Sequence, residues 1–282
     1  MKKLTAVLLT LCMTAALTAC GGAKGSSGAD AGGIKTVTSG KLTVATSPDF
    51  APYEFYAVDE NGTPELAGFD IALAGYIADY LGLELEVVPM DFDGVLMELQ
   101  TKSVDIGISG LSPDPKRESI MDFSDIYYEG GQSFVCKKDN ADKFKSLEDT
   151  NNPDYEIGAQ TGSIQVDLAE TNSPNADIIQ LTKVTDIVGE VISGKLDGAY
   201  IETPVAESYA KNYPDLCVAL PVPYEAAEGY AIGVSKGNTE LLNKINEAIA
   251  KVKSEGKMDE FVATANEQAT GEIIEGLLDS DK

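Results

Sequence analysis

The chain contains a partial internal repeat, in which a helical pattern, a tight turn and an apolar strand occur twice. The matched positions are Val95, Leu99, Val104 and Asp105 in the first copy and Ile187, Val191, Leu196 and Asp197 in the second. Strands that alternate with helices build an α/β layer with right-handed crossovers. Because the pattern occurs twice, we expect two α/β lobes whose corresponding strands end at corresponding sheet edges.

The hydrophobic pattern predicts how the chain is divided between the lobes. Apolar runs favour strands at 41–46, 85–88, 104–109, 132–137 and 155–160, with helices at Asp70, at 95–100 and near Ser163. A later helix is indicated by a stripe of Leu242, Ile245, Ala248, Ile249 and Val252. We expect a two-lobed clamshell, with lobe 1 at 41–130 and 225–282, lobe 2 at 131–224, and two hinge crossings at 127–131 and 224–230.

The first residues have the pattern of an export signal. A basic start precedes an apolar run, 4–17, that is too short to span a bilayer. The run ends in Leu17-Thr18-Ala19-Cys20, which resembles a bacterial lipobox. We expect a signal peptide at 1–19, a lipid on Cys20 and a flexible Gly- and Ser-rich tether at 20–40, which would anchor the protein outside the cytoplasm, at the cell surface or on the periplasmic side. The alternative is an ordinary cleaved signal with a chance cysteine.

Composition excludes several classes of function. With 46 acidic and 21 basic residues the formal net charge is −25, which argues against nucleic acid as a partner. The chain has no histidine, so it lacks the commonest metal ligand and the Ser-His-Asp arrangement; no metal and no cofactor are expected. Outside the leader and Cys20, only Cys136 and Cys217 remain, which allows one disulfide but no disulfide framework.

Arg117 is the only arginine in the chain and follows the turn Ser112-Pro113-Asp114-Pro115. A guanidinium presents a rigid donor fork that matches a carboxylate in two parallel hydrogen bonds. Arg117 is therefore a candidate for an anionic ligand group. The alternative is a surface or interlobe salt bridge.

Two further segments could complete such a site. Thr161-Gly162-Ser163 lies between a predicted strand and a helix, where backbone N–H groups could bind the same carboxylate, although Ser163 could simply cap the helix. Glu202 stands where an apolar strand should end, and a ligand ammonium would suit it; a solvated strand end is the alternative. Arg117 and Glu202 together complement an amino-acid zwitterion.

Phe50 and Phe92 follow loops at the ends of strands, so their rings could sandwich a ligand side chain. Core packing is the alternative for both rings.

Several motifs resemble the amino-acid branch of the extracellular solute-binding proteins (family 3), the binding subunits of ABC importers. They are Ala45-Thr46-Ser47-Pro48-Asp49-Phe50-Ala51-Pro52-Tyr53-Glu54-Phe55, Gly68-Phe69-Asp70-Ile71, Ile108-Ser109-Gly110-Leu111-Ser112 with Arg117, and Asp122-Phe123-Ser124-Asp125 with Tyr127-Tyr128. The resemblance implies that Arg117 and the Thr161 and Gly162 backbone hold an α-carboxylate. It also implies that Gly110, Ser112 and Glu202 hold an α-ammonium, with Phe50 and Phe92 beside the ligand.

The chain departs from this family at three places. Ser47 stands where glutamine- and histidine-binding members have aspartate, so the contact with the ligand side chain does not transfer. Glu202 replaces a common aspartate, which keeps the charge and lengthens the reach. A tryptophan-containing C-terminal ending is missing, which puts the last helix in doubt.

We expect a monomeric, lipid-anchored binding protein, not an enzyme, that captures a polar neutral or basic amino acid and hands it to an ABC importer permease. The rival from another class is an enzyme on the same scaffold, similar to cyclohexadienyl dehydratase, with Glu202 as acid. A sensory domain is a third possibility, which would need a signalling partner.

Overall fold

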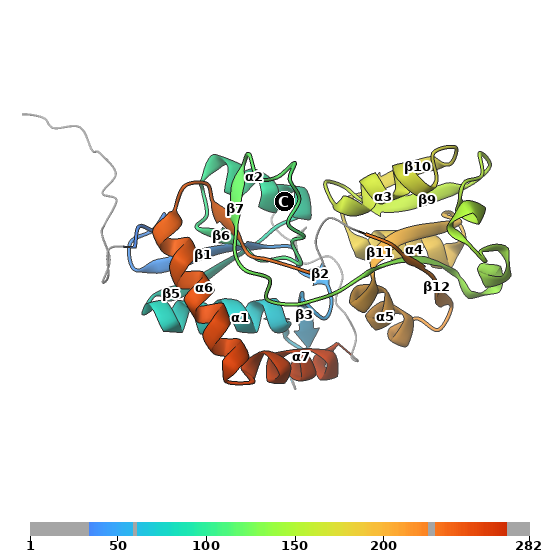
Figure 1. Ribbon diagram of the computed structural model, residues 1–282. Helices are drawn as coiled ribbons and strands as arrows, with labels where there is room; N and C mark the ends of the chain where they lie inside the picture. Colours follow the sequence, from blue (N-terminus) through green and yellow to red (C-terminus); the bar gives the residue numbers. More distant parts are fainter. Residues whose placement is uncertain (1–33, 59–60, 225–228, 270–282) are drawn as a thin grey trace, which may run out of the picture.

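The computed structural model describes residues 34–58, 61–224 and 229–269, and the described chain forms two lobes side by side (Figure 1). Each lobe is built on a five-stranded sheet, in the order β5-β1-β6-β13-β7 in the first and β10-β9-β11-β8-β12 in the second. The α/β clamshell architecture predicted from the sequence is confirmed. The signal peptide, Cys20 and the greater part of the expected tether lie outside the described residues.

The first lobe contains the sheet strands β1 (Lys41–Thr46), β5 (Glu84–Pro89), β6 (Ile106–Gly107), β7 (Met121–Phe123) and β13 (Gly233–Ser235). Its helices are α1 (Phe69–Leu81), α2 (Phe92–Thr101), α6 (Thr239–Ser254) and α7 (Lys257–Gln268). A small sheet of β2 (Asp49–Phe50), β3 (Glu54–Val58) and β4 (Pro64–Ala67) is attached to it.

The second lobe contains β8 (Gln132–Lys137), β9 (Glu156–Gln160), β10 (Asp177–Leu181), β11 (Gly198–Glu202) and β12 (Leu216–Val222). Its α-helices are α3 (Ile164–Asn172), α4 (Val184–Ser193) and α5 (Thr203–Asn212), and two 3₁₀ turns, η1 (Lys138–Lys143) and η2 (Leu147–Thr150), follow β8. The two sheets thus divide the chain near the expected crossings.

The internal repeat is visible in the topology. In the first lobe β1 is parallel to β5 and β6, and in the second β9 is parallel to β10 and β11. The repeated aspartates have the same role: Asp105 accepts a hydrogen bond from Thr43 N at 2.8 Å, and Asp197 accepts one from Glu156 N at 3.0 Å. In each lobe an aspartate at the start of one strand, β6 or β11, therefore binds the neighbouring parallel strand, β1 or β9.

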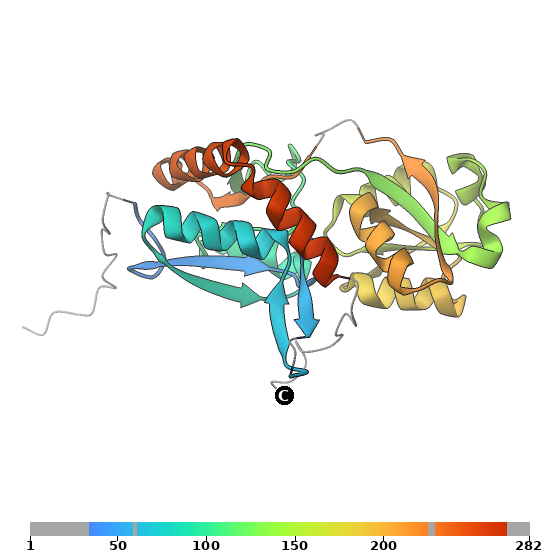
Figure 2. The same cartoon turned by 90° about the horizontal axis from the view of Figure 1, so that it is seen from below.

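Two segments differ from the expectations. Ile34 and Thr36 are buried, and Val37 N donates to Asp105 Oδ1 at 2.7 Å, so this end of the 20–40 segment packs on lobe 1 instead of forming a free tether. The last helix, put in doubt by the missing tryptophan, is formed: α7 packs against α1 and α6 (Figure 2).

Where the chain passes between the lobes, Tyr127 and Tyr128 lie beside Tyr230. Figure 1 shows the segment after β7 running from lobe 1 to lobe 2. Tyr127 N donates to Tyr230 O at 2.9 Å, and Tyr230 N donates to Tyr128 O at 2.8 Å. One hydrophobic cluster continues across the interface, since it includes Phe50 and Tyr53 of lobe 1 and Val184 and Tyr209 of lobe 2. None of the described helices is both long enough and apolar enough to span a membrane.

Candidate functional site

The interface between the lobes brings the predicted polar residues together. Lobe 1 contributes the loop after β6, which contains Gly110, Ser112 and Arg117, and lobe 2 contributes the start of α3 and the end of β11. Carboxyl ends of strands in α/β sheets are where such folds bind ligands. These predicted residues therefore lie where the strands of the two sheets end, and their role in binding stays a prediction.

Arg117 is buried and its guanidinium contacts both lobes. Nη1 donates to the Ser112 carbonyl at 3.1 Å, and Nη2 donates to the Gly162 carbonyl at 3.0 Å. The guanidinium carbon lies 5.6 Å from the centre of the Phe92 ring. Burial lowers the pKa of Arg117, yet no carboxylate lies within 4.0 Å of it in the described part of the chain. Among the described residues, its charge thus has carbonyl partners but no carboxylate at ion-pair distance.

The start of α3 differs from what the resemblance implied. The Thr161 N–H already donates to Leu181 O at 2.9 Å, so it is not a free donor for a ligand carboxylate. The Gly162 N–H has no acceptor among the described residues, and Gly162 adopts φ +76°, which suits glycine. Ser163 caps the helix, because its Oγ accepts from Gln165 N at 3.2 Å. Gly162 alone remains a candidate backbone donor in this segment.

Glu202 ends β11 and is fully buried. Its Oε1 accepts from Tyr53 OH at 2.9 Å and from Tyr230 OH at 3.0 Å, while its Oε2 accepts from Val205 N at 2.9 Å and so caps α5. Burial raises the pKa of Glu202 to about 8. The alternative prediction, that Glu202 lies at a solvated strand end, is therefore wrong. With this raised pKa, the carboxyl is largely protonated at neutral pH.

The remaining predicted residues line the same region of lobe 1. Ser47 is buried, with its N–H donating to Ser109 Oγ at 3.1 Å and its Oγ to Asp49 Oδ1 at 2.9 Å. Gly110 adopts φ +52°, and a Cβ there would lie 2.6 Å from the Phe50 ring. Both Phe50 and Phe92 are buried in hydrophobic clusters, so each ring has the core packing that was the alternative to a ligand contact.

A cavity of about 120 Å³ lies beside hydrogen-bond partners of both Arg117 and Glu202. It is lined by Ser112, Gly130, Gly131, Gln132, Val222, Tyr224, Gly229 and Tyr230. Ser112 is the hydrogen-bond partner of Arg117, and Tyr230 is that of Glu202. The volume of this cavity is below the roughly 300–1,000 Å³ that is common for ligand pockets.

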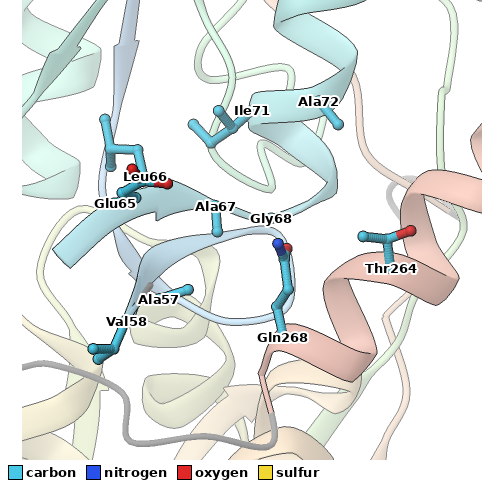
Figure 3. A pocket seen from close by; sticks show the side chains of 10 residues that line it. All are labelled: Ala57, Val58, Glu65, Leu66, Ala67, Gly68, Ile71, Ala72, Thr264 and Gln268. Carbon is cyan, nitrogen blue, oxygen red and sulfur yellow. The ribbon is translucent and has the colours of Figure 1, made fainter. Parts of the chain in front are cut away.

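A larger hollow of about 380 Å³ lies away from this interface, between the β3–β4 hairpin, α1 and α7 (Figure 3). Its lining includes Val58, Ile71 and Gln268 but none of the predicted site residues.

Asp49 is an interlobe residue that the sequence reasoning missed. Its Oδ2 accepts from Val184 N, the first residue of α4, at 2.6 Å, and its carbonyl accepts from Tyr209 OH at 2.8 Å. Burial raises the pKa of Asp49 to about 6.

A chain of buried hydrogen bonds was also missed by the sequence analysis. Gln165 Nε2 donates to Gln132 Oε1 at 2.8 Å, and Gln132 Nε2 donates to Tyr230 OH at 3.2 Å. Buried glutamines give no periodic signal, so only the tertiary structure reveals them.

No cluster of three or more histidine, cysteine, aspartate or glutamate side chains suited to a metal ion occurs in the described ranges. The polar groups of the candidate site are hydrogen-bonding groups, the guanidinium of Arg117 and buried carboxyl groups.

The two-lobed fold is that of a solute-binding protein, and the comparison with family models agrees. Residues 42–265 match the model of the bacterial extracellular solute-binding proteins, family 3. The chain belongs to this family.

Its relatives include amino-acid binding proteins of ABC transporters. The arginine-binding extracellular protein ArtP of Bacillus subtilis is 36% identical over 93% of this chain and 96% of its own length. The crystal structure of the ABC transporter substrate-binding protein AbpA from Streptococcus pneumoniae, bound to L-arginine, has a TM-score of 0.78 at 35% identity, covering 83% of this chain and 97% of the other. Cyclohexadienyl dehydratase of Pseudomonas aeruginosa is 28% identical over 69% of this chain and 71% of its own length.

Proposed function

We propose that this protein binds a free basic amino acid, with L-arginine as the first candidate, and delivers it to the permease of an ABC importer. The observation that carries the proposal is the cavity lined by Ser112 and Tyr230, which are the hydrogen-bond partners of Arg117 and Glu202. A zwitterion would give Arg117 the carboxylate that the described residues do not supply, and would give Glu202 a cationic partner.

The charge of the interface favours a cationic ligand. Asp49, Glu54, Asp70 and Glu202 are buried acids near the site, whereas Arg117 is the only buried basic side chain among the described residues. Burial disfavours uncompensated negative charge, so a ligand with one carboxylate and two cationic groups fits better than an acidic one. The names of ArtP and of the arginine-bound AbpA support the same ligand class.

A lipid on Cys20 would keep such a receptor near its permease. The apolar run, the small residues before Cys20 and the Gly-rich segment behind it support this part of the proposal. Mass spectrometry of the mature N-terminus tests it, since a cleaved but unlipidated chain would contradict the anchor.

A thermal-shift screen of the twenty amino acids tests the ligand class, because a ligand that binds only the native state raises the midpoint. L-arginine and L-lysine should raise the midpoint temperature of thermal unfolding, and acidic amino acids should not. Arg117→Ala should lose the shift, while the matched control Lys116→Ala should keep it, because the Lys116–Asp167 ion pair at 2.7 Å is exposed. No shift with any amino acid would contradict the proposal.

One observation favours the enzyme as a second candidate. The raised pKa of Glu202, about 8, makes it a neutral acid that could protonate a leaving hydroxyl, and a dehydratase is among the relatives. Incubation with prephenate or arogenate distinguishes the two functions. Turnover that disappears in Glu202→Gln would support the enzyme, and the absence of turnover would remove it.

A further inference from the structure

Glu54 of β3 and Asp70 of α1 form a buried carboxyl pair behind the ligand cleft. Both side chains are fully buried, and each influences the pKa of the other. Glu54 Oε1 accepts from Ser109 Oγ at 2.5 Å, and Asp70 Oδ2 accepts from Gly110 N at 3.0 Å and Tyr127 OH at 2.9 Å. The other two oxygens, Glu54 Oε2 and Asp70 Oδ1, have no donor in the described chain. Two ionised carboxylates only accept hydrogen bonds, so a proton held between these two oxygens would give each of them a partner.

The surroundings of the pair provide no cation to replace this proton. The groups that face it are the carboxyl of Asp49, which acts on Glu54, and the phenol of Tyr127, which donates to Asp70. The ion pairs of the described residues involve neither carboxyl. Burial and the like charge raise the pKa of Glu54 well above its ordinary value, and burial raises that of Asp70 to about 6.

The pair holds the loop that presents the site. Ser109 and Gly110, which the two carboxyls bind, follow β6, and Ser109 Oγ also accepts from Ser47 N at 3.1 Å. Gly110 has a left-handed backbone conformation and lies against Phe50. A movement of either carboxyl would therefore displace Ser47 and Gly110 together.

We propose that Glu54 and Asp70 are positioning residues that share one proton and thereby hold Ser47 and Gly110 in place, so that loss of this proton at alkaline pH weakens amino-acid binding. The effect of this proton on amino-acid binding rests on the proposed function, whereas the sharing of the proton between Glu54 and Asp70 does not. Because a buried acid with a raised pKa keeps its proton longer in the folded state than in the unfolded one, stability falls as pH rises towards the folded-state pKa.

Glu54→Gln is the direct test, because the amide can keep the bond to Ser109 through its oxygen and donate to Asp70 through its nitrogen. Its affinity for the amino acid at pH 7 should stay within about threefold of the wild type. Between pH 7 and 9.5 its affinity and its ligand-free thermal midpoint should fall less than those of the wild type. The ligand ammonium and Glu202 titrate in both proteins. The difference between the pH profiles of the wild type and of Glu54→Gln therefore measures the contribution of the Glu54–Asp70 pair. Superimposed profiles would overturn the proposal.

Asp70→Asn and the double variant give a second, independent test. Asp70→Asn should still bind the amino acid, because the amide oxygen of the asparagine can accept from Gly110 and Tyr127 while its amide nitrogen donates to Glu54. The double variant Glu54→Gln/Asp70→Asn places two NH₂ groups against each other and should lose affinity about tenfold or more relative to either single variant. Equal binding by all three variants would overturn the proposal. If the wild type bound no amino acid, the proposed function would fail, and the ligand-free midpoints would still test the shared proton.

Discussion

Arg117 and Gly162 connect the lobes, with Nη2 of the first donating to the carbonyl of the second at 3.0 Å. A carbonyl accepts a hydrogen bond but cannot neutralise a charge, and the described residues place no carboxylate in ion-pair range of Arg117. The contact can close the cleft while leaving the guanidinium able to bind a ligand anion.

Asp49→Ala should weaken ligand binding by about fivefold to tenfold, because Asp49 caps the first turn of α4 across the interface and supports lobe closure. Calorimetry measures the affinity, and small-angle scattering with saturating ligand measures closure. Ser47→Ala, which removes one hydrogen bond to Asp49 within lobe 1, is the control and should have a smaller effect. Unchanged affinity in Asp49→Ala would exclude this role.

Amino-acid binding at pH 7 should release close to one proton. Glu202 has a pKa of about 8 in the structure, so it is mostly protonated at pH 7, and a ligand ammonium would favour its ionised form. Affinity should therefore fall as pH is lowered below about 8, approaching tenfold per pH unit.

Calorimetry in buffers of different ionisation enthalpy counts this proton. Glu202→Gln should release none, since the amide does not titrate. An observed enthalpy that is independent of buffer in the wild type would contradict the assignment of Glu202 to the ammonium.

The sequence predicted the elements better than the contacts. The repeated aspartates were found because each follows a helix and a turn of the same pattern, and both bind the neighbouring parallel strand of their lobe. Periodicity also predicted the stripe of α6, although the structure buries Leu241 more deeply than Leu242.

The missed features depend on how distant segments meet. The Thr161 N–H is used by Leu181, at the end of the neighbouring strand β10, which no local pattern specifies. Asp49 lies in a loop motif that was identified, yet its bond to Val184 exists only when the lobes are in contact. Arg117 and Glu202 could be nominated because each is unusual in its own segment, whereas the tyrosines and glutamines around them are ordinary until the fold is known.

The two repeated aspartates should differ in their contribution to stability. Asp105 is buried and accepts from both Thr43 N and Val37 N, whereas Asp197 is partly exposed. We expect Asp105→Ala to lower the free energy of unfolding by about 2–3 kcal/mol and Asp197→Ala by about 1 kcal/mol. Urea denaturation measures both, and equal losses would contradict the comparison.

Cys136 should resist alkylation in the native protein. It is buried opposite Cys217 in the β8–β12 register, and burial raises the pKa of its thiol to about 12. Iodoacetamide at pH 8 followed by peptide mapping should label Cys217 first. Equal labelling rates, or a disulfide that protects both, would contradict a reduced pair of unequal reactivity.

The central claim is that Arg117 binds the ligand carboxylate, and calorimetry with L-arginine and agmatine, which lacks that carboxylate, tests it most directly. The wild type should prefer L-arginine by about tenfold to hundredfold, and Arg117→Ala should lower the affinity for L-arginine to that for agmatine while leaving agmatine nearly unaffected. If Arg117→Ala weakens both ligands equally, or if the wild type does not distinguish them, Arg117 does not bind the carboxylate.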